Sequence, residues 1–140
     1  MSVTATVKWT DGLQFVGESG SQHAIVLDAA SADGGANTGM RPIELLAIAI
    51  GSCSGMDIIS ILKKKRQNVH NLSVHVSGEL APDFPHRFVS IDIEWIITGN
   101  DVAESAVKHA VDLSMEKYCS VKATLEHSAT ISFRYKIINQ

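Results

Sequence analysis

Apolar and polar side chains alternate near the start of the chain. Apolar residues occupy every second position from Val3 to Trp9, with threonines and a lysine between them. A period of two is typical of a β-strand, and Asp11-Gly12 follows as a turn signal. Two further runs, residues 13–18 and 22–28, complete a predicted antiparallel meander. The small and polar residues 29–40 then predict a loop.

The middle of the chain predicts a long helix, from about residue 42 to residue 66. Pro42 suits the first turn of a helix, where an amide hydrogen has no partner to bond. The run from Leu45 to Leu62 is apolar enough to approach a membrane span, but Asp57 and several Gly and Ser residues dilute it. We therefore expect a buried central helix, and no membrane contact. A helix that is apolar all round needs more cover than one small subunit offers, which predicts a homodimer.

After the long helix the alternation returns. Residues 72–76 and 89–97 carry apolar side chains at every second position and predict two strands. A run at helical spacing follows and ends near Tyr118, and residues Cys119 to Leu125 predict a short turn or helix. Residues 131–137 alternate again and form the last predicted strand.

The predicted order is therefore β-β-β-α-β-β-α-β. This order defines an α+β fold, in which antiparallel sheets carry the helices on one face. The chain has 140 residues, with no internal repeat, linker or low-complexity tract. Residues 1–140 are accordingly expected to form a single domain.

Composition and charge remove several classes of function. Hydrophobic residues make up 45% of the chain and charged residues 19%, which suits a folded core. Lys and Arg total 12 against 15 Asp and Glu, a net charge of -3, so a nucleic-acid partner is not expected. The single basic cluster, Lys63-Lys64-Lys65-Arg66, ends the long helix and complements its dipole. Met1 to Ala5 carry no secretion signal, which predicts a cytoplasmic protein with free thiols.

The two cysteines are the strongest candidates for chemistry. The chain has no glycine-rich phosphate motif and no catalytic-serine motif, and its six histidines are scattered without zinc-ligand spacing. We therefore expect neither a cofactor nor a metal. Cys53 lies among small residues in the long helix, and Cys119 follows the second helix with Lys117 and Lys122 close in sequence. A nearby ammonium favours the reactive thiolate.

From the residues alone, each cysteine also has a purely structural interpretation. A cysteine on an apolar helix commonly serves as a small hydrophobic residue. Cys119 is equally well explained as a capping or packing residue. Spacing alone leaves open whether the two thiols meet.

Two segments resemble the motifs of a known family. The segment Arg41–Cys53 (RPIELLAIAIGSC) resembles the first-cysteine helix of the OsmC/Ohr family. This family comprises the osmotically inducible proteins and the organic hydroperoxide resistance proteins. The family's second-cysteine turn is similar to Lys117–Ala123 (KYCSVKA). The order of elements also matches, and the resemblance covers essentially the whole chain. It implies an OsmC-like domain that forms an intertwined homodimer with active sites at the subunit interface.

The resemblance also implies an activity, a thiol-dependent reduction of organic hydroperoxides in oxidative stress defence. Cys53 would attack the hydroperoxide and become a sulfenic acid, and Cys119 would condense with it to a disulfide. An external dithiol of the lipoyl type would restore both thiols. An apolar pocket would favour alkyl or lipid hydroperoxides as substrates.

The sequence departs from the family's pattern around the first cysteine. Ile43 stands where well-characterised members carry a carboxylate, and Glu44 lies half a turn away from Cys53 on a regular helix. The loop before the helix lacks the family's arginine, which leaves Arg41 as the nearby cation. We therefore take Arg41 and Glu44 as further candidate catalytic residues. Asp57, one turn after Cys53, would raise the pKa of that thiol unless a cation pairs with it.

Two other functions remain open. The fold would also suit a dimer that binds an apolar ligand at its interface, with redox-sensing or vestigial thiols. A cysteine nucleophile could instead perform acyl transfer or hydrolysis, although the sequence places no histidine or aspartate as its base.

Overall fold

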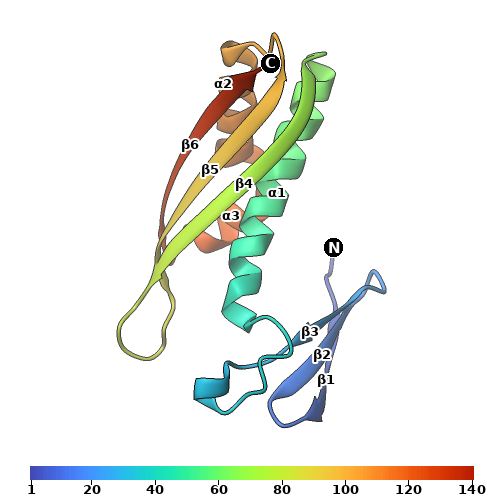
Figure 1. Ribbon diagram of the computed structural model, residues 1–140, viewed down its shortest axis with the longest axis vertical. Helices are drawn as coiled ribbons and strands as arrows, with labels where there is room; N and C mark the ends of the chain where they lie inside the picture. The colour runs from blue at the N-terminus through green and yellow to red at the C-terminus, as the bar shows by residue number, and fades with distance from the viewer. The chain divides into compact units, whose positions relative to one another are not determined.

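The computed structural model describes residues Met1–Gln140, which divide into two compact units, residues 1–46 and 47–140 (Figure 1). The elements in chain order are β1 (Ala5–Asp11), β2 (Gln14–Ser19), β3 (Ala24–Leu27), the 3₁₀ turn η1 (Ser31–Asp33), α1 (Pro42–Lys64), β4 (Asn68–Leu80), β5 (Phe88–Asn100), α2 (Glu104–Leu113), the π-helical turn η2 (Ser114–Tyr118), α3 (Ser120–Leu125) and β6 (Thr130–Asn139). This confirms the predicted α+β class and the predicted order of strands and main helices. The prediction of a single domain stays a prediction.

The first unit is the predicted meander, a three-stranded antiparallel sheet in the order β1-β2-β3. The loop that follows β3 is organised around a buried carboxylate, Asp28. Its two oxygens accept hydrogen bonds from the backbone N–H groups of Ala29, Ala36 and Thr38, and from the Thr38 hydroxyl at 2.6 Å. The loop of small residues is therefore held by one side chain.

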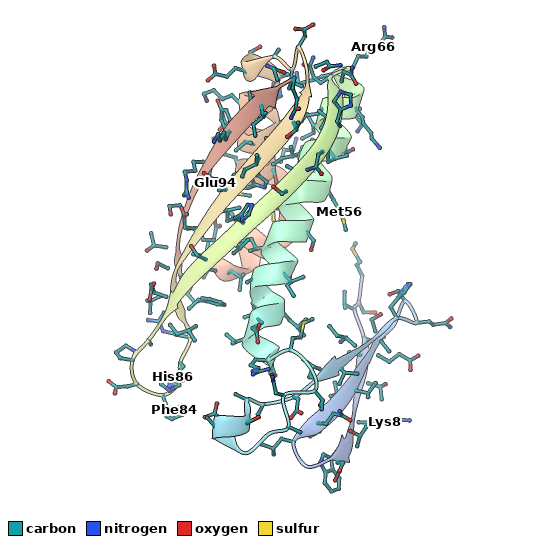
Figure 2. All side chains as sticks on the ribbon, viewed as in Figure 1. Lys8, Met56, Arg66, Phe84, His86 and Glu94 are labelled. Carbon is teal, nitrogen blue, oxygen red and sulfur yellow. The ribbon has the colours of Figure 1, made fainter.

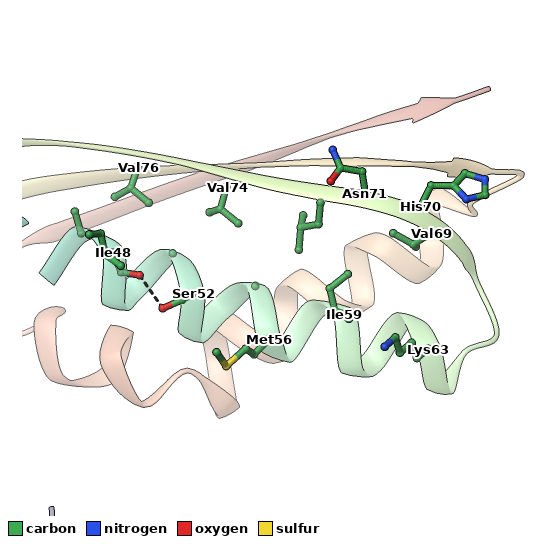
Figure 3. Close-up of a pocket in the computed structure, with 14 residues that line it drawn as sticks. Ile48, Ser52, Met56, Ile59, Lys63, Val69, His70, Asn71, Val74 and Val76 are labelled. Carbon is green, nitrogen blue, oxygen red and sulfur yellow. Dashed lines mark hydrogen bonds between the residues drawn. The ribbon is translucent and has the colours of Figure 1, made fainter. Parts of the chain in front are cut away.

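The second unit is a three-stranded sheet, β4-β5-β6, with all three α-helices on one face (Figures 1 and 3). β5 is the central strand, and its buried side chains alternate with half-buried ones, as the period of two predicts. The buried face runs from Ile91 to Ile97, whereas Val89, at the start of the strand, is exposed. The core lies between this face and the helices.

One strand pairing departs from the predicted antiparallel arrangement. β4 pairs antiparallel with β5, but β6 pairs parallel with β5, from Ser90 opposite Thr130 to Gly99 opposite Asn139. Between β5 and β6 the chain passes through α2, η2 and α3 on one face of the sheet. Such a crossover returns the chain to the end where β5 began, which makes the next strand parallel.

α1 approaches β4 closely because small residues line the contact. A Cβ atom on Gly51 would lie 3.1 Å from the Val76 side chain, and one on Gly55 would lie 3.5 Å from Val74. Between the two glycines, the fully buried Ser54 hydroxyl accepts a hydrogen bond of 3.1 Å from the Trp95 indole. These contacts join α1 to the sheet of the second unit.

α1 is long and apolar enough to cross a membrane by length and composition alone, a test that the core helix of a soluble protein also passes. Its buried positions form a stripe along the helix: Ile50, Gly51, Ser54, Gly55, Ile58 and Leu62. Other apolar positions on α1 stay exposed, including Ile48 at 51% and Met56 at 71%. Figure 2 shows Met56 projecting from the helix. The prediction of a buried helix is therefore confirmed for one face of α1 and is wrong for the exposed face.

The second helix is interrupted shortly before Cys119. Sequence spacing predicts a helix ending near Tyr118, but regular α-helix ends at Leu113 and a wider turn, η2, continues to Tyr118. The Cys119 N–H donates to the Ser114 carbonyl at 2.8 Å, a bond that spans five residues rather than four. Cys119 then caps the short helix α3, which begins at Ser120.

Candidate functional site

The second unit brings the two cysteines together with one carboxylate. The sulfurs of Cys53 and Cys119 and a carboxylate oxygen of Asp57 all lie within 4.8 Å of one another. Cys53 and Asp57 are one turn apart on α1, so their side chains share a face. Cys119 comes from the junction of η2 and α3. Both cysteines are free thiols.

The two thiols differ in exposure. Cys119 is 3% exposed and belongs to the buried core, whereas Cys53 is half-buried at the edge of that core. A molecule arriving from solvent therefore meets Cys53 first. The Cys119 sulfur lies within 4.8 Å of the Cys53 sulfur and is shielded from solvent.

Burial sets the protonation of Cys119. Burial is the largest cause and the neighbouring Cys53 and Asp57 add to it, so that the pKa of this thiol is raised to about 11. The backbone N–H of Lys122 donates to the Cys119 sulfur at 3.4 Å and lowers the pKa, but by less than burial raises it. Cys119 is therefore protonated at neutral pH.

The two lysines near Cys119 in sequence direct their ammonium groups elsewhere. Lys117 lies over the ring of its neighbour Tyr118, at 5.3 Å from the ring centre. The Lys122 ammonium contacts the Glu126 carboxylate at 2.5 Å. Lys122 thus supports Cys119 through its backbone and not through its charge.

Ser114 is a site residue that sequence analysis did not identify. Its hydroxyl donates to the Asp57 carboxylate at 2.9 Å, while its carbonyl accepts from the Cys119 N–H. Ser114 therefore links the carboxylate to the backbone of the second thiol, although it is completely buried. The sequence does contain a signal for it. Ser114 continues the helical spacing of the apolar positions in the second helix, and a polar side chain on a buried face needs a hydrogen-bond partner.

Arg41 and Glu44 pair with each other at the start of α1. A Glu44 carboxylate oxygen accepts a hydrogen bond from the Arg41 backbone N–H at 3.0 Å and lies 3.8 Å from the Arg41 guanidinium. The guanidinium also donates to the Gly39 carbonyl at 3.0 Å. A glutamate that reaches back to the residue before the first turn is half of a capping box. These contacts give both residues a structural role, and their catalytic role stays a prediction.

A largely apolar groove of about 920 Å³ runs between α1 and β4 (Figure 3). It is lined by Ala47, Ile48, Gly51, Ser52, Gly55, Met56, Ile59, Lys63, Val69, His70, Asn71, Leu72, Val74 and Val76. Neither cysteine lines it, nor does Asp57. The groove is therefore a separate feature from the thiol pair, and the sequence-based expectation of an apolar pocket at Cys53 stays a prediction.

The fold and the paired thiols define a class of protein. The sequence profile described as OsmC-like protein matches residues 34–134, most of the chain and both cysteines. This protein belongs to the OsmC-like family.

Particular relatives extend the likeness over the whole chain. The chain is similar to Protein YhfA of Escherichia coli K12, with 42% identity over 134 residues, which cover 96% of this chain and 97% of YhfA. It is also similar to a hypothetical protein of known structure from Aquifex aeolicus, with 30% identity, a TM-score of 0.87 and coverage of 100% and 98%. The organic hydroperoxide resistance protein OhrB of Bacillus subtilis shares the fold at 16% identity, with a TM-score of 0.64 and coverage of 97% and 98%.

Proposed function

We propose that this protein is a thiol-dependent peroxidase that reduces organic hydroperoxides to alcohols in oxidative stress defence. The observation that carries the proposal is the meeting of two free thiols, Cys53 and Cys119, with sulfurs within 4.8 Å. A small closing movement brings such a pair to the bond length of a disulfide, about 2 Å. Family membership and the hydroperoxide resistance proteins of similar fold support alkyl or lipid hydroperoxides as the substrate class.

In the proposed reaction, the Cys53 thiolate attacks the distal oxygen of the hydroperoxide. A sulfur–oxygen bond forms as the oxygen–oxygen bond breaks, the alkoxide takes up a proton and leaves as an alcohol, and Cys53 becomes a sulfenic acid. The Cys119 sulfur then attacks the sulfenic sulfur, and the hydroxyl group leaves as water with the thiol proton. An external dithiol, such as a lipoyl group, reduces the resulting disulfide and is itself oxidised.

The exposure of the thiols supports this division of roles. Cys53 is the half-buried thiol that a substrate reaches, and Cys119 is the buried thiol behind it. A buried resolving thiol traps the sulfenic acid before further peroxide oxidises it. Arg41 and Glu44 take part in no step of this scheme, and their variants would test the catalytic role suggested by their sequence positions.

We also propose that the working form is a cytoplasmic homodimer. Apolar side chains on α1, Ile48 and Met56 among them, are exposed although they belong to the longest helix of the chain. A second copy would cover such a surface and bury it from water. The two free thiols suit a reducing compartment, which supports the location.

The groove beside α1 favours a second candidate function. Its volume of about 920 Å³ and mainly apolar lining are in the range of small-molecule sites. An apolar ligand held there would make the protein a carrier or sensor with thiols that report redox state. Native mass spectrometry of the purified protein distinguishes the two: a bound acyl compound with peroxide-inert thiols supports the second candidate.

The deciding experiment is intact mass and free-thiol counting after one equivalent of tert-butyl hydroperoxide, with hydrogen peroxide in parallel. The proposal expects rapid loss of two thiols and of two hydrogens in mass, faster with the organic peroxide. Cys53→Ser should abolish the reaction, and Cys119→Ser should stop at a sulfenic acid that dimedone traps. Survival of both thiols in the wild-type protein would overturn the proposal.

A further inference from the structure

The thiol pair and Asp57 form a set of donors that suits a metal ion. Three potential ligand atoms, two sulfurs and one carboxylate oxygen, lie within 4.8 Å of one another in the second unit, where Cys119 is buried and the other two residues are half-buried. Thiolate together with carboxylate is a ligand combination that zinc accepts. Sequence spacing gave no hint of it, because Cys119 joins the other two residues only through the fold.

The distances are close to those of a tetrahedral zinc site. Zinc binds thiolate sulfur at about 2.3 Å and carboxylate oxygen at about 2.1 Å, so ligand atoms around it stand about 3.6 to 3.8 Å apart. The three atoms are at most 4.8 Å apart, and a closing of about 1 Å brings them to that spacing. Such a closing requires small side-chain rotations at the two cysteines as well as at Asp57.

Outer contacts already orient two of the three ligands. The buried Ser114 hydroxyl donates to Asp57 Oδ2 at 2.9 Å, which leaves Oδ1 available. The Lys122 N–H donates to the Cys119 sulfur at 3.4 Å. Hydrogen bonds of this kind to ligand atoms are characteristic of built metal sites.

The charge at the cluster is also unbalanced. The nearest lysines in sequence do not compensate the carboxylate and the two sulfurs, because Lys122 contacts Glu126 and Lys117 lies over Tyr118. A divalent cation would neutralise most of this charge. It would also explain a carboxylate placed where it otherwise opposes thiolate formation.

We propose that the reduced protein binds one Zn²⁺ through the sulfurs of Cys53 and Cys119 and a carboxylate oxygen of Asp57, with water as the fourth ligand. Binding breaks two sulfur–hydrogen bonds, forms two sulfur–zinc bonds and releases two protons, with no change in oxidation state. Half-buried Cys53 gives the fourth position access to solvent. The inference does not depend on peroxidase activity, since it concerns the reduced thiols alone.

A consequence of the proposal is that metal binding and disulfide formation exclude each other. Both use the same two sulfurs, so bound zinc protects the thiols, and a disulfide leaves no thiolate ligand. Zinc should therefore slow the reaction of the thiols with peroxide, and oxidation should release the metal.

Cobalt is the probe for the test, because Co²⁺ occupies zinc sites and its thiolate complexes absorb in the near ultraviolet. Titration of the reduced full-length protein is expected to give this charge-transfer band with one equivalent bound, and Zn²⁺ should displace it. The disulfide form should give no band. Asp57→Asn should weaken Zn²⁺ binding by at least about 100-fold, since loss of an outer-shell partner alone costs 10- to 100-fold.

The control variant is Asp112→Asn, which alters an exposed carboxylate on α2 paired with Lys108 and should bind cobalt like the wild type. Circular dichroism checks that each variant is folded. Absence of the band in the folded, reduced wild type overturns the metal site, even if peroxide still forms the disulfide. A cobalt band in a protein whose metal-free thiols resist peroxide supports the metal site and overturns the proposed peroxidase instead.

Discussion

Asp57 changes the surroundings of both thiols, because it places a carboxylate one helical turn from Cys53 and beside Cys119. A carboxylate near a thiol raises the pKa of the thiol, and it does so for Cys119 here. The Ser114 hydroxyl holds this carboxylate in place from the opposite element. One buried serine therefore connects the carboxylate to the backbone of Cys119.

Removal of the Ser114 hydroxyl is expected to destabilise the protein. Ser114→Ala leaves a half-buried carboxylate without its donor, and the loss of a hydrogen bond to a charged group costs about 1 to 3 kcal/mol in the free energy of unfolding. Urea denaturation measures the effect. The matched control is Ser105→Ala, on the exposed face of α2, which should change stability by less than about 0.5 kcal/mol. Equal stabilities for the two variants would contradict this account.

Asp28 predicts an acid-dependent contribution to stability. Four hydrogen bonds, the Thr38 hydroxyl foremost, lower the pKa of this carboxyl to about 2. Because the pKa is lower in the folded state than in the unfolded state, the carboxylate stabilises the fold above pH 4. That contribution disappears as the pH falls from about 4 to about 2.

Asp28→Asn tests this dependence. The stability difference between wild type and variant, from urea denaturation at several pH values, should be constant above pH 5 and shrink toward pH 2. A carboxyl resonance that titrates near pH 2 in NMR would identify the group. A difference that stays the same down to pH 2 would rule the interpretation out.

At the scale of elements, α1 combines close contact with the sheet on one face and exposed apolar side chains on another. The two glycines on the contact face differ in how much space β4 leaves for a Cβ atom. A Cβ on Gly55 would lie 3.5 and 3.7 Å from Val74 and Leu72, which is ordinary contact, whereas one on Gly51 would lie 3.1 Å from Val76. At Gly55, both helix propensity and the available space therefore favour alanine. At Gly51, helix propensity favours alanine but the space is too tight.

The two glycine-to-alanine variants should consequently differ in stability. Gly55→Ala is expected to raise the free energy of unfolding by up to about 1 kcal/mol, since alanine favours the helix by that amount. Gly51→Ala should gain less or lose stability, because Val76 has to move by a few tenths of an ångström. Thermal unfolding of both variants compares them directly, and a Gly51→Ala protein more stable than Gly55→Ala would contradict the packing described.

The element order follows from the sequence pattern because each element is periodic within itself. Alternation from Ile91 to Ile97 predicts β5, and Pro42 predicts the first residue of α1. The π-helical turn at Ser114 could not be predicted, since its residues continue the helical spacing and the extra width depends on tertiary contacts. The parallel pairing of β6 is likewise a matter of how the chain crosses the sheet.

The same limit applies to the candidate site. Cys53 and Asp57 can be placed on one face from helix geometry, but their meeting with Cys119 depends on how α1 and η2 come together in the second unit. The likeness to family motifs suggested a partnership that residue spacing could not supply. The lysines near Cys119 show the opposite case, because proximity in sequence did not bring their charges to the sulfur.

For the whole molecule, the exposed apolar surface of α1 leads to a prediction about assembly. Met56 is 71% exposed on the second unit, and a lysine there would place a charge at the proposed dimer contact (Figure 2). Met56→Lys should convert the proposed dimer to monomer, or raise its dissociation constant by at least about tenfold, a change of about 1.4 kcal/mol. Size-exclusion chromatography with light scattering measures the mass at several concentrations.

Phe84→Lys is the control for this substitution. Phe84 is 88% exposed on the loop between β4 and β5, away from α1, so the added charge should leave the mass unchanged. A wild-type protein that is monomeric at high concentration would refute the proposed dimer, and loss of the dimer in both variants would place the contact elsewhere.

The wide turn before Cys119 also determines which kind of genetic change separates the two thiols. Each residue of a helix advances the chain by about 100° around the axis, so one residue more or fewer redirects everything that follows. A point substitution in Ser114–Tyr118 leaves that count intact. Insertion of a single residue there would turn the chain by about a further 100° and swing Cys119 away from Cys53, while every chemical group is retained. The proximity of the two thiols is therefore more sensitive to the number of residues in this turn than to their type.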